Sequence, residues 1–206
     1  MNLQTQAEFL RSRRELIFAL RKLRQGDFSV RLPEDGTQSD VELATLFNEV
    51  VSLNQQMTAE FERLSRDPTF RHFLALCISE RTASDVGPVE IRSADPEVVT
   101  LAAHWLRRLS NGRIDYRLQF DEGQDVVEMV RFWTGRLGIG HDRIRLQRWF
   151  RGRPVPPRVR VAEHGVMTVR SSNADLRIRL HGWMQRIREE GFPEVPQEEL
   201  FDLAGR

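Results

Sequence analysis

The feature that most limits how this chain can fold is a narrow apolar stripe in the first third of the sequence. Its members recur at intervals of three and four residues: Leu43, Leu46, Val50, Leu53 and Met57. This spacing predicts a helix with one apolar side, and a stripe of this width is typical of a helix that packs against another helix. We therefore expect the apolar stripe to form a coiled-coil dimer interface.

A shorter helix and an extended connector precede this helix. The first helix is predicted to end at Gly26, and residues 27–32 then alternate between polar and apolar side chains. A period of two indicates an extended segment with one side buried. The alternative is an ordinary helical hairpin that packs on the rest of its own chain.

Residues 19–36 and 42–66 resemble a HAMP signalling module, the dimeric four-helix unit of bacterial receptors and histidine kinases. The run from Gly26 to Pro33 (GDFSVRLP) and the opening of the second helix, with Glu42, Phe47 and Asn48, carry the resemblance. The resemblance implies a parallel homodimer in which both helices of each subunit join one bundle.

Composition limits the remaining possibilities. The 206 residues allow one large or two small domains, and the 40% apolar and 30% charged fractions fit a soluble protein with a modest core. The single cysteine, Cys77, excludes an internal disulfide and fits a reducing cytoplasm. No apolar run approaches the ~20 residues that cross a bilayer, so we expect no membrane partner.

Charge divides the chain into three parts. Residues 1–68 carry a net charge of −2, residues 69–190 carry 21 basic and 15 acidic side chains (+6), and residues 191–206 carry −3. We expect a HAMP-like dimerisation module, a basic second domain and a flexible acidic tail over these ranges. A basic domain is compatible with contact to phosphate or nucleic acid.

The second domain is predicted to be α+β, a small and mostly antiparallel sheet with helices on one face. Capping residues, hydrophobic periodicity and turn signals place its elements. The expected helices span 69–80, 95–109, 125–137 and 173–190, and the expected strands span 89–92, 114–120, 143–150, 159–161 and 166–171, the last two as a hairpin.

Two short motifs are specific in the second domain: the turn at residues 94–96 (ADP) and the helix end with Phe132, Trp133, Leu137 and Gly138. Through them, most of residues 72–190 resemble the LAGLIDADG-like proteins of bacteria, relatives of homing endonucleases. The resemblance makes residues 74–81 a diverged signature helix and implies that Glu80 would be both the catalytic and the metal-binding carboxylate, with Mg²⁺ as the cofactor if the protein is a nuclease. Ala75 and Ser79 would form the face on which two copies of this helix meet. Arg81 beside Glu80 departs from the family pattern, so cleavage ranks third among the functions considered.

Polar side chains alternate with the apolar ones along the expected strands. If the apolar sides face the helices, the opposite face carries Arg92, Arg117, Gln119, Arg143, Arg145, Gln147, Thr168 and Arg170. Arginine pairs with guanine edges, glutamine with adenine edges, and both reach phosphates. The alternative is that these residues are only the solvated side of an amphipathic sheet.

Three functions follow from these observations. The first is a dimeric, cytoplasmic regulator that binds duplex DNA through this sheet face without cleaving it. The alternative is a signalling adaptor in which the HAMP-like bundle is the working part and the second domain binds another protein. The third is a Mg²⁺-dependent endonuclease.

Overall fold

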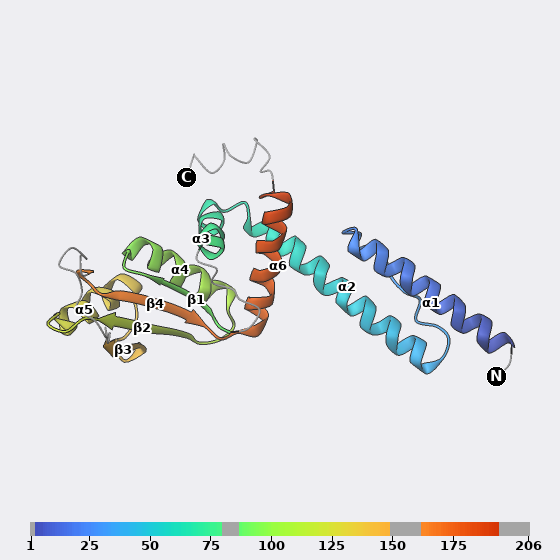
Figure 1. The fold of residues 1–206 in the computed structure, drawn as a ribbon, viewed down its shortest axis with the longest axis horizontal. Coiled ribbons are helices and arrows are strands. Elements are labelled where there is room, and N and C mark those ends of the chain that lie inside the picture. The colour runs from blue at the N-terminus through green and yellow to red at the C-terminus, as the bar shows by residue number, and fades with distance from the viewer. Residues whose placement is uncertain (1–2, 80–86, 149–161, 194–206) are drawn as a thin grey trace. The chain divides into compact units, whose positions relative to one another are not determined.

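The computed structural model describes residues 3–79, 87–148 and 162–193, and the chain divides into two compact units, residues 1–64 and 65–206 (Figure 1). The described residues form six α-helices and a four-stranded mixed sheet. The α+β class expected from the sequence is therefore confirmed. Each unit is described separately below.

The N-terminal unit is a helical hairpin. Helix α1 (Leu3–Arg24) is followed by a connector and by helix α2 (Gln38–Leu64). Thr37 and Asp40 begin α2 with a reciprocal cap, in which the Asp40 amide donates to the Thr37 hydroxyl oxygen at 3.3 Å and the Thr37 amide donates to Asp40 Oδ2 at 3.2 Å. Such a cap satisfies backbone donors that the first helical turn leaves unpaired.

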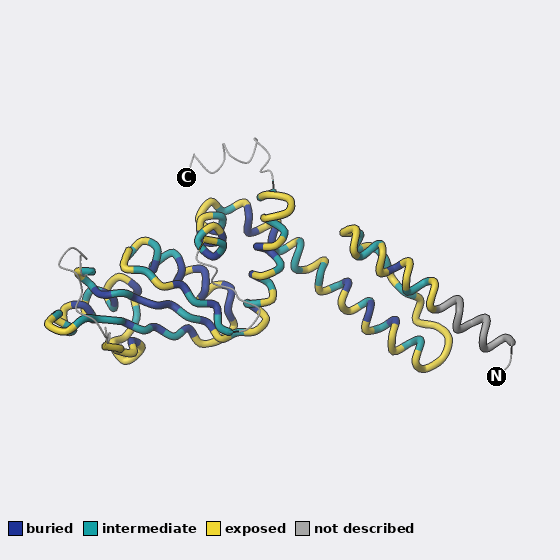
Figure 2. Tube along the Cα trace, in the orientation of Figure 1, coloured by how far each residue is buried: buried dark blue, intermediate teal, exposed yellow. Residues whose placement is uncertain are grey.

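The core of this unit forms between the two helices and the connector. Ala19 of α1 and Phe47 and Val51 of α2 are buried (Figure 2). Half-buried apolar residues from α1 and the connector pack against them: Leu16, Leu23, Phe28, Val30 and Leu32. The alternation at 28, 30 and 32 thus buries one side of the connector, as the sequence predicts.

The Asn48 side chain holds the connector against α2. Its amide nitrogen donates to the Leu32 carbonyl, its amide oxygen accepts from the Leu32 amide, and both distances are 2.9 Å. Arg31 adds a bond to Gln55 on α2 at 2.7 Å. A segment without a strand partner therefore has its backbone groups satisfied by a side chain.

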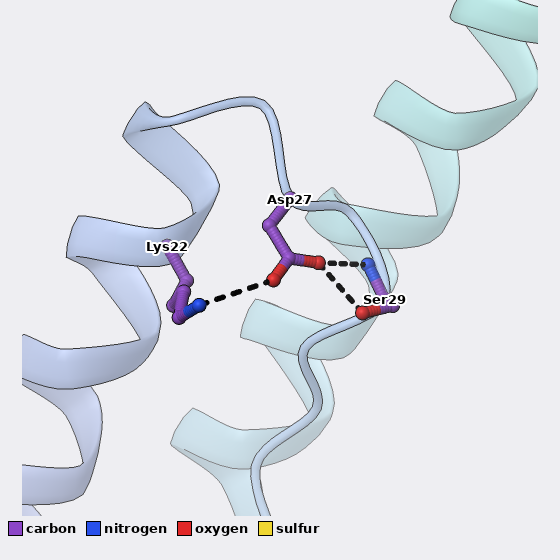
Figure 3. Close-up of polar contacts among 3 residues, drawn as sticks. All are labelled: Lys22, Asp27 and Ser29. Carbon is purple, nitrogen blue, oxygen red and sulfur yellow. Dashed lines mark hydrogen bonds and ion pairs between the residues drawn. The ribbon is translucent and has the colours of Figure 1, made fainter.

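The end of α1 is closed by a polar turn (Figure 3). Asp27 Oδ1 accepts from the Ser29 hydroxyl at 2.6 Å and from the Ser29 amide at 3.1 Å, and Lys22 Nζ lies 3.7 Å from Asp27 Oδ2. The bonds from Ser29 and the charge of Lys22 lower the pKa of Asp27 below its usual 3.8.

The second unit follows the predicted order of elements. They are α3 (Pro68–Ser79), β1 (Val89–Ser93), α4 (Pro96–Leu109), β2 (Ile114–Phe120), α5 (Val126–Leu137), β3 (Ile144–Arg148), β4 (Val166–Ser171) and α6 (Ala174–Glu190). Side-chain oxygens cap the starts of α4, α5 and α6 by accepting hydrogen bonds from backbone amides at 2.8–3.0 Å. The capping residues are, in order, Asp95, Asp125 and Asn173. Gly138 ends α5 in the left-handed conformation, with φ of 60°.

The strands are ordered β1-β4-β2-β3 in the sheet. β4 pairs antiparallel with both β1 and β2, and β2 pairs parallel with β3. The expectation of a mostly antiparallel sheet holds, with one parallel pair. The expected partner of β4 in a hairpin, residues 159–161, lies outside the described residues, as do the last two residues of the expected strand 143–150.

One face of the sheet forms the core of this unit. Ile91, Tyr116, Leu118 and Val169 are buried there, and α4 packs against β1, β2 and β4. α4 covers this face of the sheet, and α3 in turn packs on α4 and on α6. The aromatic side chains of Phe70, Phe73, Trp105 and Trp183 fill this second layer, with ring centroids 4.9–6.4 Å apart.

In residues 3–79, 87–148 and 162–193, no helix combines the length and the apolar character that a bilayer span requires.

Candidate nucleic-acid interface

Three arginines and a threonine lie in one row across the sheet. The strand register places Arg92 of β1 opposite Thr168 of β4, Thr168 opposite Arg117 of β2, and Arg117 opposite Arg145 of β3. We call Arg92, Arg117 and Arg145 the arginine row. With strands about 4.8 Å apart, the row spans roughly 14 Å. The sequence identifies the members, and the register shows that they line up.

Thr168 marks how closely the long side chains lie together. It points to the same face as the arginine row, yet only 3% of it is exposed. A short side chain between two long cross-strand neighbours is covered by them. The row is thus a packed surface in which Arg92 and Arg145 are exposed and Arg117 is half-buried.

Carboxylates flank the next row. Arg170 of β4 lies opposite Glu90 on one side and Asp115 on the other. Asp115 also lies 3.9 Å from Arg145 and 3.6 Å from Arg113. Ion pairs this exposed contribute little to stability, so the pairs of Asp115 with Arg113 and Arg145 are weak.

A small hollow of about 90 Å³ opens between the two rows. It is lined by Asp115, Tyr116, Arg117, Arg145, Thr168 and Arg170. Arg170 Nε is buried beside it without a hydrogen-bond partner among the described residues. A buried donor without a partner carries a free-energy cost that an acceptor would remove.

The two glutamines pair with each other on the same face. Gln119 Nε2 donates to Gln147 Oε1 at 3.4 Å across the β2–β3 pair, while Gln119 Oε1 is buried without a partner in the described parts.

Arg143 does not lie on the strand in which the sequence analysis placed it. It lies in a 3₁₀ turn before β3, and its guanidinium donates to the Ile114 carbonyl at 3.2 Å.

The apolar stripe of the N-terminal unit lies outside that unit's own core. Leu46 is 55% exposed and Leu53 is 63% exposed, Leu43 and Val50 are also exposed, and Met57 is half-buried. Ile17, Phe18 and Leu20 of α1 are likewise exposed. Sequence reasoning missed that α2 has a second apolar side, formed by Ala44, Phe47 and Val51, and this side packs on α1.

The residues implied by the LAGLIDADG-like resemblance are only partly described. Ala75 and Ser79 are exposed on α3, and the Ser79 hydroxyl donates to the Leu76 carbonyl at 2.9 Å. Glu80 lies outside the described residues, so its catalytic and Mg²⁺-binding roles stay predictions. In the described ranges, no three His, Cys, Asp or Glu side chains gather as a metal site.

Comparison with known proteins does not assign the chain to a family. No protein-family model matches the chain, and no curated protein or solved structure is significantly similar to it. The HAMP-like and LAGLIDADG-like resemblances therefore stay predictions based on their residues.

Proposed function

We propose that this protein is a dimeric regulator that binds duplex DNA through the polar face of its sheet, without cleaving it. The observation that carries the proposal is the arginine row. Its span of roughly 14 Å is close to the ~12 Å width of the major groove, which admits a β-ribbon. Arginine side chains at this spacing suit phosphates on both walls of the groove and guanine edges on its floor.

The hollow beside the row supports the same proposal. Arg117, Arg145 and Arg170 converge on it, and the unpartnered Arg170 Nε would gain a phosphate oxygen as its acceptor. The Gln119–Gln147 pair adds amides of the kind that recognise adenine.

The apolar stripe supports the dimer. Four of its five members are exposed in a single copy, although each leucine would gain about 1.5–3 kcal/mol from burial. We expect this face to contact a second copy of the chain, because the exposed apolar residues of α2 repeat at intervals of three and four residues, which suits a helix bundle. A cytoplasmic location is proposed with it, since the single cysteine, Cys77, allows no internal disulfide.

Salt dependence of duplex binding tests the proposal. A dimer uses six arginines, three from each copy of the row, so the logarithm of the binding constant should fall with the logarithm of salt concentration with a slope of roughly −5. Arg145→Gln removes two of these contacts per dimer and should reduce the slope by about 2.

Arg188→Gln is the matched control, because Arg188 is exposed on α6 and the charge change is the same. It should leave the slope unaltered. Absence of duplex binding at low salt, or equal slopes for the two variants, would rule out the arginine row as a DNA contact.

The second candidate function is an adaptor in which the helical unit recognises another protein. The exposed apolar stripe is the observation that favours it. A chain that stays monomeric alone, and binds no duplex, would support the adaptor in place of the DNA-binding dimer.

A further inference from the structure

A second basic surface lies away from the strands, in a groove between α4 and α5. Its volume is about 440 Å³, within the range of small-molecule sites. Ala103 and Leu137 are buried apolar residues of its lining, and four basic side chains surround them: His104, Arg107, Arg108 and Arg136. Sequence reasoning missed this group because its members come from two separate helices.

The basic side chains are held in place before any ligand arrives. Arg107 Nε donates to the Tyr116 hydroxyl at 2.7 Å, and its Nη2 donates to the Leu137 carbonyl at 2.8 Å. Arg108 lies over the Trp105 ring, with its guanidinium carbon 5.0 Å from the ring centroid. His104 meets the same ring edge-on at 5.2 Å. Fixed side chains lose little conformational entropy when they bind.

The positive charge of the groove is only partly balanced. Among the described residues, Glu97 is the one carboxylate that forms an ion pair with this group, through Arg136. Arg107 also bonds the last carbonyl of α5, a capping role that fits its position. Arg136 pairs with Glu97 and Arg108 lies over Trp105, and both guanidinium groups remain exposed beside the groove.

We propose that this groove binds a small organic phosphate, an anion with an apolar body. The apolar lining would contact the body, and the guanidinium groups would bind the phosphate through charge-assisted hydrogen bonds. Inorganic phosphate alone would leave the apolar lining uncovered. This site is independent of the arginine row and of the proposed DNA contact.

The probe is 1-naphthyl phosphate, titrated against the full chain and followed by calorimetry. We expect saturable binding, and binding at least about tenfold weaker for both 1-naphthol and inorganic phosphate, because each lacks half of the recognised features. Arg136→Gln and Arg108→Gln should each weaken binding about tenfold. Both arginines are exposed, so neither change should disturb the fold.

Arg188→Gln, exposed on α6, is the matched control and should bind the probe like the unaltered protein. The duplex experiment above depends on Arg145 and not on Arg136, so failure of one site is distinguishable from failure of the other. No saturable binding, or equal binding by the Arg136→Gln variant, would overturn the proposal. Tighter binding of a short glutamate peptide than of the probe would also overturn it, since the groove would then recognise an acidic protein segment.

Discussion

The two units of this protein use their apolar residues in opposite ways. In the sheet unit, the largest apolar side chains are enclosed, and Phe73, Trp105 and Trp133 have no exposed surface. In the helical unit, the core cluster between the helices has three buried residues, Ala19, Phe47 and Val51, and Leu53, at 63% exposed, is one of several large apolar side chains left outside it. One copy of the sheet unit encloses most of its large apolar side chains, whereas one copy of the helical unit leaves several exposed.

This difference also separates the roles we propose. The sheet unit offers fixed charges on a rigid surface, which suits recognition of an anion. The helical unit offers an apolar surface on two helices, which suits association. The predictions below test this division.

The largest effect is expected from the core of the sheet unit. Phe73→Ala removes a fully buried ring that stacks on Trp105 with centroids 6.4 Å apart, and it should lower the free energy of unfolding by about 3–5 kcal/mol. All four tryptophans lie beyond residue 64, so tryptophan fluorescence during urea unfolding follows this unit alone. Ile178→Ala, at an exposed position, should change the free energy of unfolding by less than about 0.5 kcal/mol. Equal effects would mean that the ring is not part of a cooperative core.

The next effect concerns association of the helical unit. Leu53→Asp places a charge in the apolar stripe of both copies and should raise the dissociation constant of the dimer at least about 100-fold. Sedimentation over a range of concentrations measures this. Val127→Asp is the matched control, because Val127 is an exposed apolar residue, 69% accessible, in the sheet unit. If the Leu53→Asp variant still forms a dimer, the apolar stripe is not the dimer interface and would contact another partner.

A smaller effect, of opposite sign, is expected at Thr100. Its hydroxyl is buried without a hydrogen-bond partner among the described residues. Thr100→Val keeps the shape and removes the unsatisfied group, so the free energy of unfolding of the sheet unit should rise by about 1 kcal/mol. Thr100→Ser keeps the hydroxyl and should not stabilise the protein. Destabilisation by the valine would show that the hydroxyl has an acceptor after all.

The smallest effect is a pH dependence in the helical unit. The pKa of Asp27 is lowered, first by the hydrogen bonds from Ser29, so its folded pKa lies below the unfolded value of 3.8. The stabilisation is therefore present above pH 3.8 and is lost as the pH falls through the folded pKa. Asp27→Asn should reduce this part of the acid sensitivity, measured by helix content. An acid sensitivity that is unaltered in this variant would place the titrating group elsewhere.

Local chemistry in the sequence predicted much of the fold. Asp95, Asp125 and Asn173 begin the helices as expected, because an N-cap depends on neighbouring residues only. The alternation at 114–120 likewise predicted β2 residue by residue. Such features require no knowledge of what lies across the molecule.

Features that depend on distant pairing were not predictable. The sequence of 144–148 does not indicate that β3 runs parallel to β2, since parallel and antiparallel pairing are compatible with the same alternation of side chains. The groove beside α4 depends on how α5 crosses it, so Arg136 could not be grouped with Arg108. The arginine row was identifiable as a set of outward residues, but its alignment required the register.

Lys22, which pairs with Asp27 at the end of α1, is the only lysine in the chain. Apart from the α-amino group, an acylating dye therefore has one reactive amine, and that amine sits where the helix meets the connector. A fluorophore attached there would follow the opening of this turn, with no engineered cysteine.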